Sequence, residues 1–154
     1  MTTEQIDRRG ESLNKLHTLL DTRKETLSLY TQLAGMRPFQ SNQDMQAALQ
    51  EFCQTLVDYT ATAHFQLYQY IVAGNERRGG VKQIADKVYP SISSLTESIL
   101  DFNEKYDCEE CENLANLLTR LDTDLSKLGE ILADRITLED QIISAYSDNA
   151  VTSH

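Results

Sequence analysis

Apolar residues recur at intervals of three and four positions along four long stretches of this chain. The stretches run from Leu13 to Ala34, Leu49 to Ile71, Ile84 to Phe102 and Leu114 to Tyr146. Such spacing places the apolar side chains on one side of an α-helix. No stretch shows the sustained apolar and polar alternation that is typical of strands. The pattern predicts an all-α protein, an antiparallel up-and-down four-helix bundle.

Glycine, proline and capping residues mark where these helices end or bend. The segments AGMRP and AGNERRGG follow the first and second stretches, and Ser41 and Asn42 suit the N-cap of the second helix. Pro90 is expected to bend the third helix. The buried stripe of the first helix is expected to consist of Leu13, Leu16, Leu20, Leu27, Tyr30 and Ala34.

A chain of 154 residues with 40% apolar residues can bury the core of one ordinary domain. Residues 1–154 are therefore expected to form a single helical-bundle domain. Residues 1–10 and 148–154 are expected to fray. A short extra helix from Thr3 to Arg9 is the alternative for the N-terminal end.

The net charge of −10 narrows the classes of partner. A strongly acidic protein is repelled by DNA, RNA and anionic lipid, so the charge favours a basic protein partner and excludes direct nucleic-acid binding. No apolar run approaches the roughly 20 residues that a bilayer requires. We expect a soluble, cytoplasmic protein with no membrane contact.

Charged residues interrupt two of the apolar stripes. Arg135 and Glu139 continue the stripe of the fourth stretch, and Arg23 lies on that of the first. Buried charges are unfavourable by several kcal/mol unless they are paired, so we expect these side chains to form an internal polar network. His64 flanks the apolar stripe of the second stretch, one turn before Tyr68, and both are expected to join the network. We interpret His64 as a core histidine rather than a catalytic group.

Catalytic motifs are missing from the sequence. The 3 histidines include no Glu-x-x-His pair of the kind that di-iron bundles require. There is also no G-x-S-x-G elbow, no P-loop and no G-x-G-x-x-G. We therefore expect a protein with no enzymatic activity, catalytic residue, cofactor or metal.

The 3 cysteines leave one alternative open. Cys108 and Cys111 form a CEEC segment that could serve as a redox pair or half of a zinc site, which would make the protein a redox- or metal-responsive interaction module. However, no second CxxC or nearby histidine completes a zinc ligand set. Free thiols, including Cys53, are the simpler interpretation.

The second stretch has an unusual outward face. Opposite its apolar stripe the helical periodicity places an acid, an aromatic residue and small neighbours, which is typical of a protein-binding surface. Incidental exposure is the alternative, because single exposed apolar residues are common. The residues of this face are Asp58, Ala61, Thr62, Phe65, Gln69 and Val72.

The same stretch carries a family resemblance. The segment EFCQTLVDYTATAHFQLYQYI, residues 51–71, resembles the signature helix of the Rsd/AlgQ family, the bacterial regulators of sigma D type. Further similarity lies in RKETLSLYTQLAG, YPSISSLTESILDFNEKYD and LGEILADRITLEDQII, and it covers most of the chain.

The resemblance implies an anti-sigma factor that binds region 4 of the primary sigma factor. Such binding keeps sigma from promoter −35 elements and core RNA polymerase. Asp58 matches the family aspartate expected at the sigma contact, whereas His64, Arg135, Glu139 and Asp140 match its interior and LED positions.

Two departures from the family pattern weaken this expectation. His17, Thr18, Leu19 and Leu20 replace an Asp-Arg-Trp-Leu-like segment, and Gln69 replaces an acid. A family relative with a different regulatory partner is therefore also considered.

Overall fold

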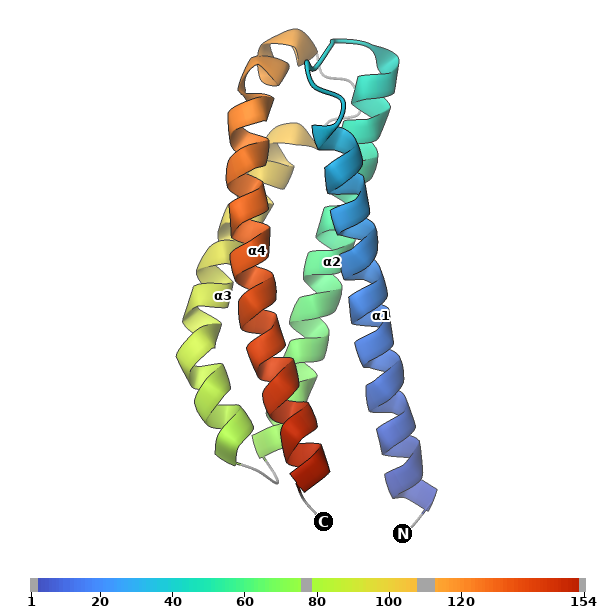
Figure 1. Ribbon diagram of the computed structural model, residues 1–154, viewed down its shortest axis with the longest axis vertical. Coiled ribbons are helices and arrows are strands. Elements are labelled where there is room, and N and C mark those ends of the chain that lie inside the picture. Colours follow the sequence, from blue (N-terminus) through green and yellow to red (C-terminus); the bar gives the residue numbers. More distant parts are fainter. Residues whose placement is uncertain (1–2, 76–78, 108–112, 153–154) are drawn as a thin grey trace.

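The protein folds into four long helices that run alternately up and down. The computed structural model describes the backbone of residues 3–75, 79–107 and 113–152, and the side chains of residues 17–67, 83–107 and 113–145. Figure 1 shows the helices side by side, with both termini at the same end of the bundle. The predicted all-α four-helix bundle is confirmed. The helices are α1 (Thr3–Ala34), α2 (Gln43–Asn75), α3 (Gly79–Tyr106) and α4 (Leu114–Thr152).

The helices begin and end largely where the local sequence predicts. Beyond Ala34, the amide of Gly35 still donates to the carbonyl of Thr31 at 3.0 Å. Asn42 is the N-cap of α2, because its side-chain oxygen accepts a hydrogen bond of 2.8 Å from the amide of Met45. Pro90 lies within α3, and the helix follows a curved path in Figure 1.

One expectation for the N-terminal end of the chain was wrong. Residues 3–9 form no separate helix, because α1 continues without a break from Thr3. At the other end α4 runs to Thr152. The fraying expected for residues 1–10 and 148–154 stays a prediction.

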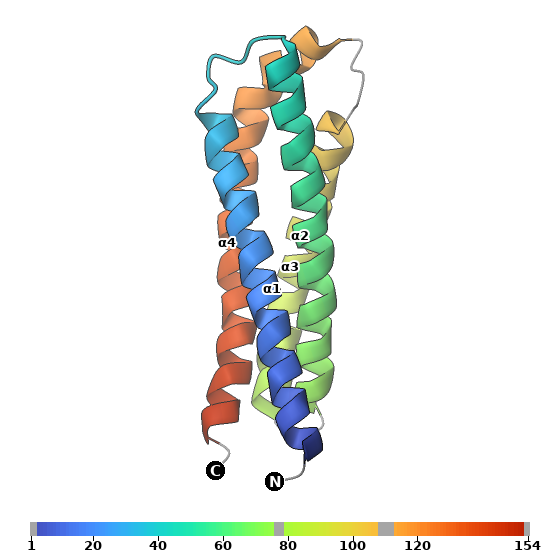
Figure 2. The same cartoon turned by 90° about the vertical axis from the view of Figure 1, so that its right-hand side faces the viewer.

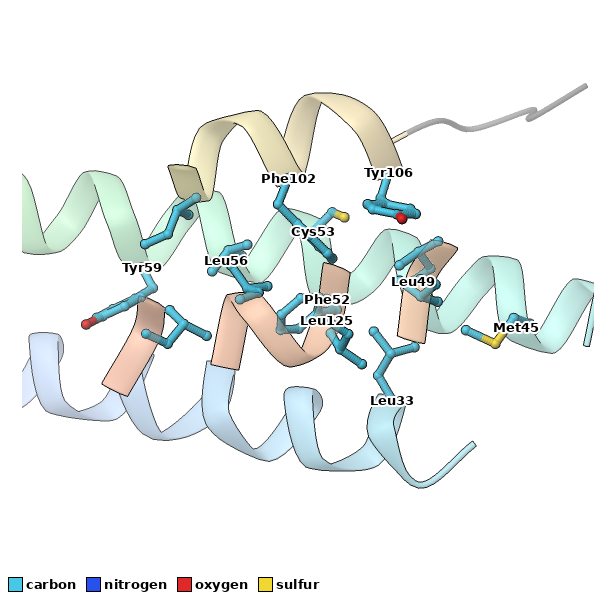
Figure 3. Packing of buried hydrophobic residues seen from close by; sticks show 14 of the residues in the cluster. Leu33, Met45, Leu49, Phe52, Cys53, Leu56, Tyr59, Phe102, Tyr106 and Leu125 are labelled. Carbon is cyan, nitrogen blue, oxygen red and sulfur yellow. The ribbon is translucent and has the colours of Figure 1, made fainter. Parts of the chain in front are cut away.

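The core lies along the bundle axis and is built mainly of leucine and aromatic side chains. In Figure 3, Leu33 of α1, Phe52 of α2, Phe102 of α3 and Leu125 of α4 converge from the four helices. The rings of Phe52 and Phe102 pack edge to face, with their centroids 6.1 Å apart. A second, smaller cluster lies towards the termini and comprises Leu67, Val88, Ile92 and Ile142.

Helix α1 packs chiefly on α2, and this changes its buried stripe. Figure 2 shows α1 in front of the bundle, between α2 and α4, with α3 on the far side. The buried residues of α1 include Leu19, Thr26 and Leu33. Leu20 and Leu27 are 36% and 39% exposed, so their assignment to the buried stripe was wrong. They lie one turn before and one turn after Arg23, whose side chain reaches α4, and α1 packs much less closely on α4 than on α2.

None of the helices, over the residues that the structure describes, is long and apolar enough to cross a membrane.

Candidate functional site

A buried polar cluster joins all four helices between the two apolar clusters. Arg135 and Glu139 lie one turn apart on α4, with side chains only 1% and 0% exposed, and form an ion pair. The hydroxyl of Tyr59 on α2 donates to Glu139 at 2.7 Å. The Nε of Arg135 donates to Thr96 Oγ1 on α3 at 3.2 Å. Both buried charges therefore have partners, as their free energy of burial requires.

Arg23 completes this cluster from α1. Its Nη1 lies 2.9 Å from Asp140 Oδ1 and 3.4 Å from Glu139 Oε2. Burial of Arg23 opposes its charge, but the hydrogen bond and negative charge of Asp140 outweigh burial and raise the pKa of Arg23. The structure thus brings together Arg23, Arg135, Glu139 and Asp140, although the Asp140 side chain itself is 53% exposed.

The protonation of the cluster favours a structural role. Burial, followed by the negative charge of Glu139, raises the pKa of the Tyr59 hydroxyl, which therefore stays protonated and remains a donor. Burial also raises the pKa of the Glu139 carboxyl, and the positive charge of Arg135 opposes that rise. Because Tyr59, Arg135 and Arg23 already surround Glu139, this carboxyl is occupied with contacts inside the protein.

Tyr59 and Thr96 were not predicted as members of the cluster. Tyr59 does carry a signal in the sequence, because it falls on the buried stripe of α2 between Leu56 and Ala63 and brings a hydroxyl there. Thr96 has no comparable signal, since it is one of several small polar residues along α3.

His64 is not part of the interior, and its predicted place in the network was wrong. The residue is exposed, and its Nδ1 lies 3.5 Å from the hydroxyl of Tyr89 on α3. Its contact with Tyr89 places it on the flank of α2 that faces α3, outside the core. Tyr68, the other predicted member from α2, lies outside the residues whose side chains the structure describes.

The outward face of α2 presents an aromatic side chain to solvent. Phe65 is 69% exposed, and Asp58 and Ala61 are also exposed, whereas Thr62 is half-buried. Asp58 and Phe65 are seven residues apart, close to two helical turns, and therefore lie on the same side of α2. Gln69 and Val72 belong to α2, but their side chains are outside the described set.

The described cysteine has the properties of a core residue. Cys53 is a free, buried thiol, and burial raises its pKa to about 12, which disfavours the reactive thiolate. Cys108 and Cys111 lie outside the described residues. Among the residues that are described, no group of three or more His, Cys, Asp or Glu side chains could hold a metal ion.

Comparison with known proteins identifies the relatives of this chain. Residues 2–147 match the family described as "Regulator of RNA polymerase sigma(70) subunit, Rsd/AlgQ". No solved structure matches the chain.

Relatives of this chain include proteins named "Regulator of sigma D" from several bacteria. The protein from Enterobacter sp. (strain 638) is 35% identical over 150 residues, covering 95% of this chain and 88% of the relative. The protein from Yersinia enterocolitica is 33% identical over 137 residues, covering 87% and 81%. That from Escherichia coli (strain K12 / DH10B) is 32% identical over 164 aligned positions, covering 97% of each chain. The chain therefore belongs to the Rsd/AlgQ family of regulators of the RNA polymerase sigma(70) subunit.

Proposed function

We propose that this protein binds region 4 of the primary sigma factor through the outward face of α2. The main observation in support is that Phe65 is 69% exposed and lies on the same side of the helix as the exposed Asp58. An exposed aromatic side chain beside a single charge is typical of residues that contribute most to binding at protein interfaces. The family, and relatives named for regulation of sigma D, support sigma as the partner.

The charge of the protein favours this partner. A DNA-binding helix-turn-helix domain presents Lys and Arg to the phosphates of DNA. A protein with a net charge of −10 can occupy the same basic surface, because complementary charges accelerate association and orient the two proteins. Binding then competes with promoter recognition and with attachment to core RNA polymerase. The outcome is sequestration of sigma in the cytoplasm, which requires affinity but no chemistry.

The residues of the face have distinct roles in this proposal. Phe65 supplies the apolar anchor and Asp58 pairs with a basic side chain of sigma. Ala61 is small and lets the partner approach the helix, and Thr62 lies at the edge of the contact. Gln69 and Val72 are expected to extend it by one or two turns.

The interior cluster has a supporting role. Tyr59 follows Asp58 directly and is anchored by Glu139, so the cluster fixes the rotation of α2 about its axis. This rotation keeps Asp58 and Phe65 directed outward.

The proposal is tested by calorimetric titration of the full chain with purified region 4 of the primary sigma factor from the same organism. Asp58→Ala and Phe65→Ala are compared with Asp134→Ala, which removes an exposed acid from α4. We expect binding by the parent protein and by Asp134→Ala, and binding at least about tenfold weaker for the two α2 variants. Equal affinity of all four proteins would place the contact elsewhere, and no binding by any of them would reject region 4 as the partner.

A further inference from the structure

The charged residues of α2 form one column on its surface. Asp44, Glu51 and Asp58 follow one another at intervals of seven residues, and residues 43–75 contain no Lys or Arg. Seven residues are close to two helical turns and advance about 10 Å along the axis. All three acids are exposed, and the next position at this interval is Phe65. The column, defined as Asp44, Glu51 and Asp58, therefore leads directly to the exposed aromatic ring.

The acids of this column differ from those on α4. Among the residues that the structure describes, none of Asp44, Glu51 and Asp58 takes part in an ion pair, so these exposed carboxylates remain available to a partner. Three acids of α4 are instead paired with basic residues of α1, of α3 and of the loop between α1 and α2. These pairs are Asp122 with Arg37, Asp124 with Lys105 and Asp140 with Arg23.

A shallow hollow of about 570 Å³ adjoins the column in the groove between α1 and α2. Glu51 belongs both to the column and to the lining of this hollow, and Asp21 and Glu25 line it from α1. Lys24 is the one basic residue of the lining, and Leu29 adds an apolar surface. Besides Glu51, the lining therefore contributes two carboxylates and one ammonium group, a net charge of −1, and provides a concave surface beside the column.

The other side of the column carries two exposed alanines. Ala47 and Ala61 are exposed on the outward face of α2, with Gln54 between them at the same seven-residue spacing. Small side chains allow a second helix to pack close to the first, since the distance between helix axes depends on the side chains at the contact. This part of α2 thus offers room for an approaching helix.

We propose that the acidic column and the adjoining groove form a docking track for a basic helix of the partner. Lys or Arg side chains of that helix, repeated at seven-residue spacing, would pair with Asp44, Glu51 and Asp58. Charge complementarity specifies a basic occupant, and the column extends the face proposed above to bind sigma. The identity of the partner as sigma region 4 rests on the proposed function, whereas the basic character of the occupant rests on α2 itself.

The test uses a double variant that removes charge and preserves shape, Asp44→Asn with Glu51→Gln, leaving Asp58 and Phe65 in place. Its matched control is Glu97→Gln with Glu104→Gln, which removes two exposed acids from α3. Association rate and affinity for region 4 are measured at low and high salt. Two exposed ion pairs predict affinity roughly three- to thirtyfold weaker for the column variant, with a smaller salt dependence, and near-parental affinity for the control.

A second probe separates the docking track from the proposed function. It is a synthetic amphipathic helix with arginine at every seventh position, titrated into each full-length protein by calorimetry. If region 4 fails to bind but this peptide binds the parent more tightly than the column variant, region 4 is rejected and the docking track stands. If region 4 binds parent and column variant equally, the docking track is overturned and the proposed function stands. If neither ligand binds the parent protein, both proposals are overturned.

Discussion

The hydroxyl of Tyr30 on α1 occupies the space into which a side chain at position 129 of α4 would project. Because residue 129 is glycine, the ring can approach α4, and its hydroxyl donates a hydrogen bond of 2.8 Å to the carbonyl of Leu125. Arg23 and Arg37, seven residues to either side of Tyr30, each form an ion pair with an aspartate of α4. Polar side chains of α1, and Arg37 in the loop that follows it, thus join this part of the chain to α4, on which α1 packs less closely than on α2.

Gly129→Ala is expected to destabilise the fold. The added methyl group forces the Tyr30 ring aside and breaks its hydrogen bond to α4, which costs about 1–3 kcal/mol. The higher helix propensity of alanine offsets at most about 1 kcal/mol of this loss. The free energy of unfolding in urea measures the net effect. A Tyr30→Phe background removes the closest contact, that of the hydroxyl, and leaves the ring carbon Cζ 3.0 Å from the added methyl group. The same substitution should therefore cost less there, and an equal cost in both backgrounds would contradict the proposed clash.

Arg135→Ala is expected to destabilise the protein by about 3–5 kcal/mol, because it leaves the buried Glu139 without its ion-pair partner. Replacing both residues, as in Arg135→Met with Glu139→Leu, removes the buried charges together and should recover much of the loss. Thermal unfolding of the three proteins makes the comparison. If the single variant melts like the parent protein, the ion pair contributes nothing to stability.

Stability is expected to fall above about pH 9. Burial raises the pKa of the Cys53 thiol from 9.0 to about 12 and raises the pKa of the Tyr59 and Tyr106 hydroxyls above 10.0. The unfolded chain releases these protons first, so the contribution is complete at lower pH and is lost as pH rises from the ordinary pKa values to the raised ones. Urea unfolding across the alkaline range measures this loss. Tyr59→Phe should be less stable near neutral pH but should lose less stability at alkaline pH. If the free energy of unfolding of this variant falls with pH as steeply as that of the parent protein, Tyr59 ionises freely in the native state.

Neighbouring leucines of α1 should respond very differently to truncation. Leu19 is 0% exposed, so Leu19→Ala is expected to cost about 2–5 kcal/mol through lost burial and an unfilled cavity. Leu20 is 36% exposed, so Leu20→Ala should cost less than about 1 kcal/mol. The free energy of unfolding of both variants in urea shows which of the two leucines faces the core. A larger cost at Leu20 would favour the stripe predicted from the apolar spacing alone.

Several features follow from the sequence alone. Apolar spacing along the chain determined the four helices, and short polar connections determined their antiparallel order. The same periodicity placed Arg135 and Glu139 on a buried stripe and Asp58 and Phe65 on an exposed face. These predictions succeed because each residue lies close to the middle of the buried or exposed side, where a small rotation of the helix changes nothing.

Only the tertiary structure decided the residues at the flanks of each helix. His64 and Leu20 lie near the boundary between core and solvent, and both proved to be exposed. Tyr59, Thr96 and Gly129 acquire their roles from side chains that arrive from other helices. Helical periodicity specifies the direction in which a side chain points from the axis of its own helix. Whether a side chain at the flank is buried depends on how closely the neighbouring helix packs. In this protein α1 packs tightly on α2 and loosely on α4, and that difference is a property of the assembled bundle.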